Sequence, residues 1–110
     1  MYFQVATKMA VVFGTDGFTQ AVSMEGANAV ILDGTLFAKG GGNTTVTLQG
    51  SNDMENWSTT GFTGGSVAFT ALGYMDGDAS TIAYRYVRLK INHATSGTAI
   101  IALGINTAQL

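Results

Sequence analysis

The chain has 110 residues, the length of one domain rather than two, since domains run to roughly 100–200 residues. Charged residues make up 11% of the chain, with 5 Lys and Arg against 7 Asp and Glu, and hydrophobic residues make up 46%. This composition excludes a disordered tail, which needs high charge, and five cations are too few for electrostatic binding to nucleic acid or for a polybasic membrane anchor.

Apolar residues recur at every second position along much of the chain, as in half-buried β-strands, and no helical stripe is present. The first predicted strand ends at the turn of residues 14–17, and a short strand is expected at residues 19–23. Residues 29–38 are apolar on both faces around Asp33 and Gly34, which indicates either two strands joined by a tight turn or one strand with a bulge at the glycine. The inward-facing side chains of the first strand share one parity: Phe3, Val5, Met9, Val11 and Phe13.

The same alternation continues in the second half of the chain. It predicts strands at residues 45–49, 57–60, 66–71, 84–91 and 99–105. Residues 74–81 are expected to form a loop, and residues 92–97 a turn. About eight strands with turn signals between them predict an all-β fold, an antiparallel β-sandwich of jelly-roll type that occupies residues 1–110 as a single domain. The predicted core consists of Phe3, Val5, Val11, Val46, Leu48, Trp57, Val87, Leu89, Ile91, Ile101 and Leu103.

The sequence shows no catalytic constellation. His93 is the only histidine and is expected to be a solvated side chain in a turn. Asp76 and Asp78 form a close pair, but Asp-Gly turn chemistry explains them better than a calcium site, because nothing nearby supplies further oxygen ligands. The glycine run at residues 40–42 lacks the Lys-Ser/Thr of a phosphate-binding loop, and no cysteine is present for a thiolate metal site. We therefore expect no enzymatic activity, no cofactor and no metal.

Two segments carry a resemblance to a known family. Residues 48–57 read Leu-Gln-Gly-Ser-Asn-Asp-Met-Glu-Asn-Trp, and residues 84–91 read Tyr-Arg-Tyr-Val-Arg-Leu-Lys-Ile. This pairing resembles the core of the discoidin-like, or galactose-binding-like, β-sandwich family over residues 44–106, and it is similar to small sandwich modules of tailed-phage structural proteins. The resemblance implies a β-sandwich that serves sugar binding, lipid binding or a purely structural role. The chain lacks the cysteines that bracket the family's domain and is shorter than its sugar-binding members.

The residues of these segments also have a physical interpretation of their own. Asn52 and Asp53 are expected to close the turn by bonding their own backbone. Trp57, the only tryptophan, is predicted to fill one end of the core. Arg88 shares a strand face with Tyr84 and Tyr86, so its guanidinium is predicted to stack on their phenol rings in a structural role.

The first functional hypothesis is a non-enzymatic, self-assembling structural protein, most concretely a phage virion component such as a capsid decoration or tail-associated protein. Its partners would be copies of itself and other structural subunits of a larger particle, and its location the virion. A small domain with 46% hydrophobic residues leaves apolar surface exposed, and large apolar patches mark interfaces. The strand within residues 1–13 carries a single charge, Lys8, whereas edge strands are normally protected by charges, prolines or bulges. We therefore expect residues 1–13 to contribute to a contact between subunits.

The alternative is an extracellular or cell-surface carbohydrate-binding module of the galactose-binding-like type. Its ligand-binding residues would be Trp57, Tyr74, Asp76 and Asp78, with calcium as a conceivable addition. This alternative requires Trp57 to be exposed at a loop tip.

Overall fold

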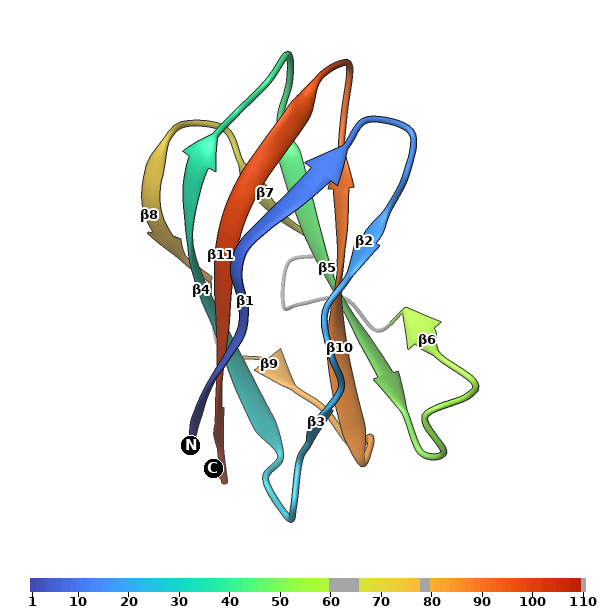
Figure 1. The fold of residues 1–110 in the computed structure, drawn as a ribbon. Helices are drawn as coiled ribbons and strands as arrows, with labels where there is room; N and C mark the ends of the chain where they lie inside the picture. Colours follow the sequence, from blue (N-terminus) through green and yellow to red (C-terminus); the bar gives the residue numbers. More distant parts are fainter. Residues whose placement is uncertain (60–65, 78–79, 110) are drawn as a thin grey trace.

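In a computed structural model that describes residues 1–59, 66–77 and 80–109, the chain folds into two antiparallel β-sheets that face each other (Figure 1). Nothing in this part of the chain forms a helix, so it contains no helix that could cross a membrane. The strands of the described residues are β1 (Tyr2–Val12), β2 (Gly17–Phe18), β3 (Val22–Ser23), β4 (Ala29–Ala38), β5 (Thr44–Ser51), β6 (Ser58–Thr59), β7 (Val67–Phe69), β8 (Gly73–Asp76), β9 (Ser80–Thr81), β10 (Tyr86–His93) and β11 (Thr98–Ala108).

The strand order is that of a jelly roll. The first sheet, which we call sheet A, runs β1-β11-β4-β8 with β9 also on β4, and sheet B runs β2-β10-β5-β6 with β3 also on β10 and β7 also on β5. At three positions, two short strands follow each other along the same neighbour: β8 and β9 on β4, β2 and β3 on β10, and β6 and β7 on β5. The eleven strands of the described residues therefore fill eight positions. The predicted all-β sandwich is confirmed. The loop predicted at residues 74–81 is wrong in part, because it contains most of β8 and all of β9.

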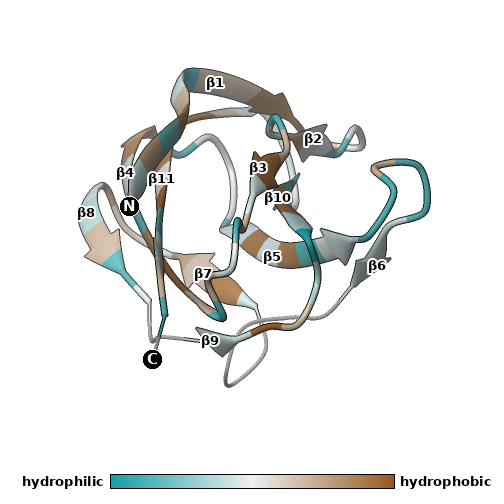
Figure 2. Cartoon of the chain, turned by 90° about the horizontal axis from the view of Figure 1, so that it is seen from below, coloured by the Kyte–Doolittle hydropathy of each residue, from teal (hydrophilic) through white to brown (hydrophobic). Residues whose placement is uncertain are grey.

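Alternate residues of the central strands build the core between the sheets. Val87, Leu89 and Ile91 on β10 are completely buried, as the alternation predicted, and Ile101 on β11 is buried with them. Figure 2 shows the same alternation of apolar and polar residues along β5. The predicted core residues are all buried except Phe3, which is half-buried, and Trp57, which lies outside the core.

Strand β1 forms one edge of sheet A and pairs with β11. Its register is irregular between Gln4 and Met9, so the consecutive residues Val5 and Ala6 are both buried. Such an irregularity resets which residues face inward. The prediction that Phe13 faces inward is therefore wrong: this residue lies beyond the end of β1 and is 53% exposed.

Strand β4 is one continuous strand across Gly34. Its only irregularity against β11 lies opposite Ile100 and Ile101, so neither the tight turn nor the bulge predicted at the glycine occurs. A Cβ at Gly34 would lie 2.7 Å from the carbonyl oxygen of Ala102 and 2.8 Å from Cδ2 of Leu103. The glycine is therefore required for the close approach of β11 and not for a change of direction.

Candidate functional site

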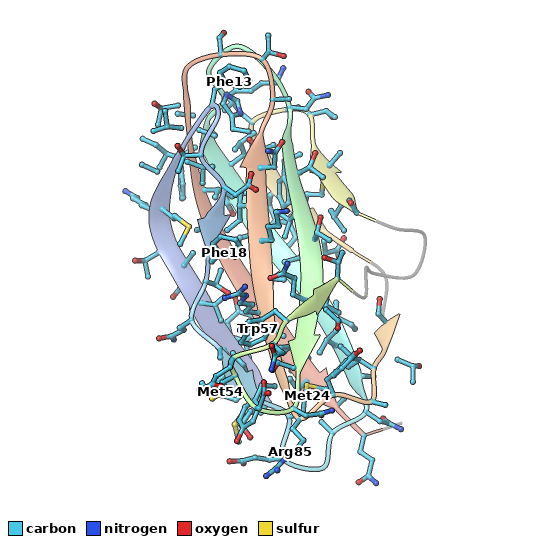
Figure 3. All side chains as sticks on the ribbon, turned by 90° about the vertical axis from the view of Figure 1, so that its right-hand side faces the viewer. Phe13, Phe18, Met24, Met54, Trp57 and Arg85 are labelled. Atoms are coloured by element: carbon cyan, nitrogen blue, oxygen red, sulfur yellow. The ribbon has the colours of Figure 1, made fainter. Side chains whose placement is uncertain are left out.

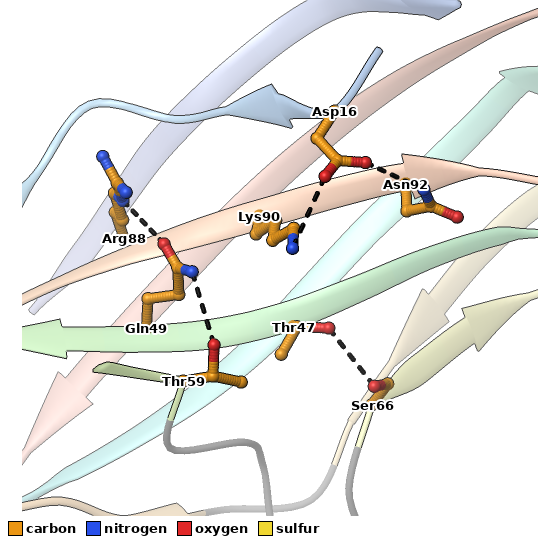
Figure 4. Close-up of polar contacts among 8 residues, drawn as sticks. All are labelled: Asp16, Thr47, Gln49, Thr59, Ser66, Arg88, Lys90 and Asn92. Carbon is orange, nitrogen blue, oxygen red and sulfur yellow. Dashed lines mark hydrogen bonds and ion pairs between the residues drawn. The ribbon is translucent and has the colours of Figure 1, made fainter. Parts of the chain in front are cut away.

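The outer face of sheet B holds Arg88 between two aromatic rings. The guanidinium carbon lies 4.3 Å from the centre of the Trp57 ring and 4.4 Å from the centre of the Phe18 ring. The Nε group of Arg88 donates a hydrogen bond of 2.8 Å to Oε1 of Gln49, whose Nε2 reaches Oγ1 of Thr59 at 3.5 Å (Figure 4). Within the described part of the chain, the Nη groups of Arg88 have no hydrogen-bond partner. We call Phe18, Arg88, Trp57 and Gln49 the arginine clamp.

The other cation of this strand face is already paired. Lys90 lies 3.4 Å from Oδ2 of Asp16, and Asn92 donates a hydrogen bond of 2.8 Å to Oδ1 of the same carboxylate (Figure 4). The Asn92 hydrogen bond, assisted by Lys90, lowers the pKa of Asp16. The charge of Lys90 is thus compensated at close range, while that of Arg88 is not.

The turn after β5 places Trp57 in the clamp. Oδ1 of Asp53 accepts hydrogen bonds from the backbone N–H groups of Glu55 and Asn56, at 2.9 and 2.8 Å. These backbone groups, together with the side chains of Asn56 and Ser51, hold the pKa of Asp53 far below its usual range. The turn predicted at Asp53 forms, but it carries Trp57 across the outer face of sheet B, on the side seen in Figure 3. The prediction that Trp57 fills one end of the core is wrong.

The stacking partners predicted for Arg88 are also wrong. Its rings are Phe18 and Trp57 instead of Tyr84 and Tyr86. Tyr84 precedes β10 and packs against the edge of the core, where its ring covers the space that a side chain at position 50 would need. Tyr86 lies beside the guanidinium of Arg85, at 5.8 Å.

The outer face of sheet A carries a carboxylate between two phenols. Oδ1 of Asp33 accepts a hydrogen bond of 3.1 Å from the hydroxyl of Tyr2, and Oδ2 accepts one of 3.2 Å from the hydroxyl of Tyr74. Desolvation first, and then the hydrogen bond and charge of Asp33, raise the pKa of both phenols. The three residues come from β1, β4 and β8, and we call them the tyrosine–aspartate cluster.

Large side chains of sheet A are exposed to solvent, including the two phenols of the cluster. Tyr2 is 56% exposed, Ile31 40%, Phe37 48% and Tyr74 66%. The ring of Phe37 has the ammonium of Lys8 at 5.2 Å from its centre. Sheet A therefore presents large apolar groups to solvent across β1, β4 and β8.

His93 is not the solvated side chain that the sequence predicted. It is the last residue of β10 and is 1% exposed. Its Nε2 lies 2.8 Å from the carbonyl oxygen of Ser96, and its Nδ1 lies 3.2 Å from Oγ1 of Thr44. Because a carbonyl only accepts, Nε2 carries the proton of the bond to Ser96. The ring closes this end of the sandwich as a structural group.

The ligand-binding residues of the alternative hypothesis do not form one site. Trp57 lies on sheet B, whereas Tyr74 and Asp76 are part of β8 in sheet A. Asp78 lies outside the described residues. Among the residues that the structure describes, no group of three or more His, Asp or Glu side chains is placed to share a metal ion.

One end of the sandwich is hollowed. Two adjoining hollows, of about 560 and 470 Å³, share the segment of residues 23–27. The first also borders residues 81–86, including Arg85, and the second borders Met1. Neither hollow brings together the residues of the clamp or of the cluster.

Comparison with known proteins finds a likeness at the level of fold. No protein-family model and no curated protein sequence matches the chain. A solved structure, that of PBSX exported protein XepA, aligns with the whole chain at a TM-score of 0.65 and 15% sequence identity. The chain is similar in fold to XepA. It spans 38% of the length of XepA, so the likeness concerns one part of that protein. The resemblance to the discoidin-like family stays a prediction.

Proposed function

We propose that the chain is a non-enzymatic structural subunit that assembles with copies of itself and with other subunits of a larger particle. In its most specific form the proposal makes it a phage virion component, either a capsid decoration or a tail-associated protein. The observation that carries the proposal is the outer face of sheet A, where Tyr2, Ile31, Phe37 and Tyr74 are 40–66% exposed. Apolar groups gathered on one face of a small protein mark an interface.

The free edge of sheet A adds to this support. Within the described residues, β1 is bonded to β11 on one side, and no strand is paired with its other side. Lys8 is the only charged side chain of this strand and adopts a φ of 136°, which belongs to an irregularity that interrupts the edge. Lys8 and this irregularity protect the middle of the edge, and the segments of β1 on either side are where a neighbouring subunit would pack or add a strand.

The virion setting is a separate part of the proposal. It is supported by the resemblance of the two sequence segments to modules of tailed-phage structural proteins. XepA is an exported protein, and an exported location for this chain is part of the proposal.

Carbohydrate binding is retained as the second candidate because of one observation. Trp57 is not exposed at a loop tip, as the sequence hypothesis required, but it is half-buried on the outer face of sheet B, beside Arg88 and the Gln49 that Arg88 bonds. An aromatic face next to hydrogen-bonding groups suits a sugar ring. In this form the candidate depends on the arginine clamp, because Tyr74 and Asp76 lie on the other sheet.

The experiment that tests assembly through sheet A compares two matched variants. The contact proposed here is the face of sheet A and the edge of β1, which ends at Val12. Phe37→Asp places a charge on that face, and Phe13→Asp places one beyond the end of β1, at the tip of the molecule, where Phe13 is similarly exposed (Figure 3). We expect the wild-type chain and Phe13→Asp to form the same particles in negative-stain images, and Phe37→Asp to form none. Equal assembly of all three would remove sheet A from the interface, and binding of sugar by a monomeric wild-type chain would favour the second candidate.

A further inference from the structure

We propose that copies of the chain associate head to tail, with the outer face of sheet A of one copy on the outer face of sheet B of the next, and that Asp33 of the first pairs with Arg88 of the second. This inference rests on the proposed function, because it specifies how the subunits contact one another. The occupant of each face is therefore a second copy of this chain.

The two faces have opposite charges at their centres. Arg88 is part of β10, which lies between β5 and the short strands β2 and β3, and Asp33 is part of β4, which lies between β11 and β8. Neither residue has an ion-pair partner among the described residues, where the ion pair found is that of Lys90 with Asp16. A carboxylate at the centre of one face and a guanidinium at the centre of the other are complementary.

Both charged groups are held in position before any contact forms. Two rings and Gln49 fix the guanidinium of Arg88, and this arrangement leaves its Nη groups free of protein partners among the described residues. Two phenol hydroxyls fix the carboxylate of Asp33, and each of its oxygens retains a lone pair for a further donor. A guanidinium and a carboxylate form two parallel hydrogen bonds, and immobilised side chains lose little entropy when they do so.

Aromatic groups flank the charge on both faces. Phe18 is 45% exposed beside Arg88, and Tyr2 and Tyr74 are exposed on either side of Asp33. The centre of a stable interface is rich in Tyr, Trp, Phe and Arg and poor in other charged residues. The Asp33–Arg88 pair with aromatic rings beside it shares the aromatic and arginine content of such a centre, and Asp76, opposite Asp33 on β8, adds a second negative charge to the face of sheet A.

The direction of association follows from the fold. The outer faces of the two sheets point away from each other, so one copy can contact two neighbours at once. A contact between different surfaces repeats from copy to copy and leads to a closed ring or to a filament, whereas a contact between identical surfaces stops at a dimer.

The test uses two neutralising substitutions that preserve side-chain shape as far as possible. Arg88→Gln removes the cation of sheet B, and Asp33→Asn removes the anion of sheet A. Lys90→Gln is the matched control, because it removes a cation of the same strand face that Asp16 already pairs. Circular dichroism checks that each variant is folded, and sedimentation equilibrium measures association.

We expect each neutralising variant to raise the dissociation constant at least about tenfold, and Lys90→Gln to change it much less. An equimolar mixture of Arg88→Gln and Asp33→Asn should form dimers and nothing larger, because such a pair retains one intact contact.

Three results would overturn the inference. If both variants associate as strongly as the wild-type chain, or if their mixture stays monomeric, the head-to-tail contact is excluded. Self-assembly through another surface would still be compatible with either result. A wild-type chain that is monomeric at every concentration would instead refute the proposed function together with the inference.

Discussion

Arg88 lies over the ring of Trp57 on the outside of the sandwich, with the guanidinium carbon 4.3 Å from the centre of the ring. The only tryptophan of the chain therefore belongs to the surface and not to the core. Its fluorescence reports on the arginine clamp, because no other indole contributes to the signal.

We expect Trp57 to emit as a partly exposed indole. Arg88→Ala removes the cation that covers one face of the ring, so acrylamide should quench the emission more strongly and the emission maximum should move to the red. The lost stacking should lower the free energy of unfolding by about 0.5–2 kcal/mol. Emission typical of a buried indole, unchanged in Arg88→Ala, would place Trp57 in the core after all.

Leu89→Ala tests the position of the core. Leu89 is completely buried on β10, so its truncation should lower the free energy of unfolding by about 2–5 kcal/mol in urea denaturation. Leu72→Ala is the matched control, because Leu72 is 62% exposed and its truncation should cost less than about 0.5 kcal/mol. Equal costs for the two variants would show that β10 presents its other face to the core.

Asp33→Asn tests the tyrosine–aspartate cluster. The pKa values of Tyr2 and Tyr74 are raised in the folded state, in part by Asp33, so removal of this charge should lower both. Ultraviolet absorbance of tyrosinate in an alkaline titration measures the change, and Asp16→Asn on the other sheet serves as the control. Because the phenol pKa values are raised, this contribution to stability should be fully present below the ordinary pKa of about 10 and should be lost as the pH rises through the raised pKa values. Identical titrations of the two variants would contradict the hydrogen bonds of the cluster.

Asp53→Asn tests the turn that positions Trp57. The pKa of Asp53 is lowered in the folded state, so its carboxylate stabilises the fold fully above about pH 4, and this contribution is lost as the pH falls through the lowered pKa. The wild-type chain should therefore be more stable than Asp53→Asn at neutral pH, and the difference should shrink in acid. Thermal unfolding over a range of pH measures it, and a difference that does not depend on pH would mean that the carboxylate's charge has no part in the turn.

The alternation of apolar and polar residues predicted the sandwich, because a strand that buries one face needs an apolar side chain at every second position. The inward rows of β10 and β11 were therefore predicted residue by residue. The same signal could have found His93, which continues the parity of Val87, Leu89 and Ile91 and is buried with them. The prediction placed His93 in a solvated turn because the residue is polar and is followed by turn-forming residues.

The two candidate surfaces were harder to predict, because they join residues that are distant in the sequence. Phe18 and Arg88 meet only because β2 pairs with β10, and Tyr2 and Tyr74 reach Asp33 only because β1 and β8 lie on either side of the central strands of sheet A. Trp57 follows a turn, where strand parity no longer determines which way a side chain points. The irregular register of β1 is likewise a tertiary feature that alternation does not reveal.

The molar mass of the wild-type chain in solution tests the proposed assembly most directly. Light scattering behind a sizing column, over a series of loading concentrations, should give masses that are multiples of 11.4 kDa and that rise with concentration. A constant mass of 11.4 kDa at every concentration would contradict self-assembly.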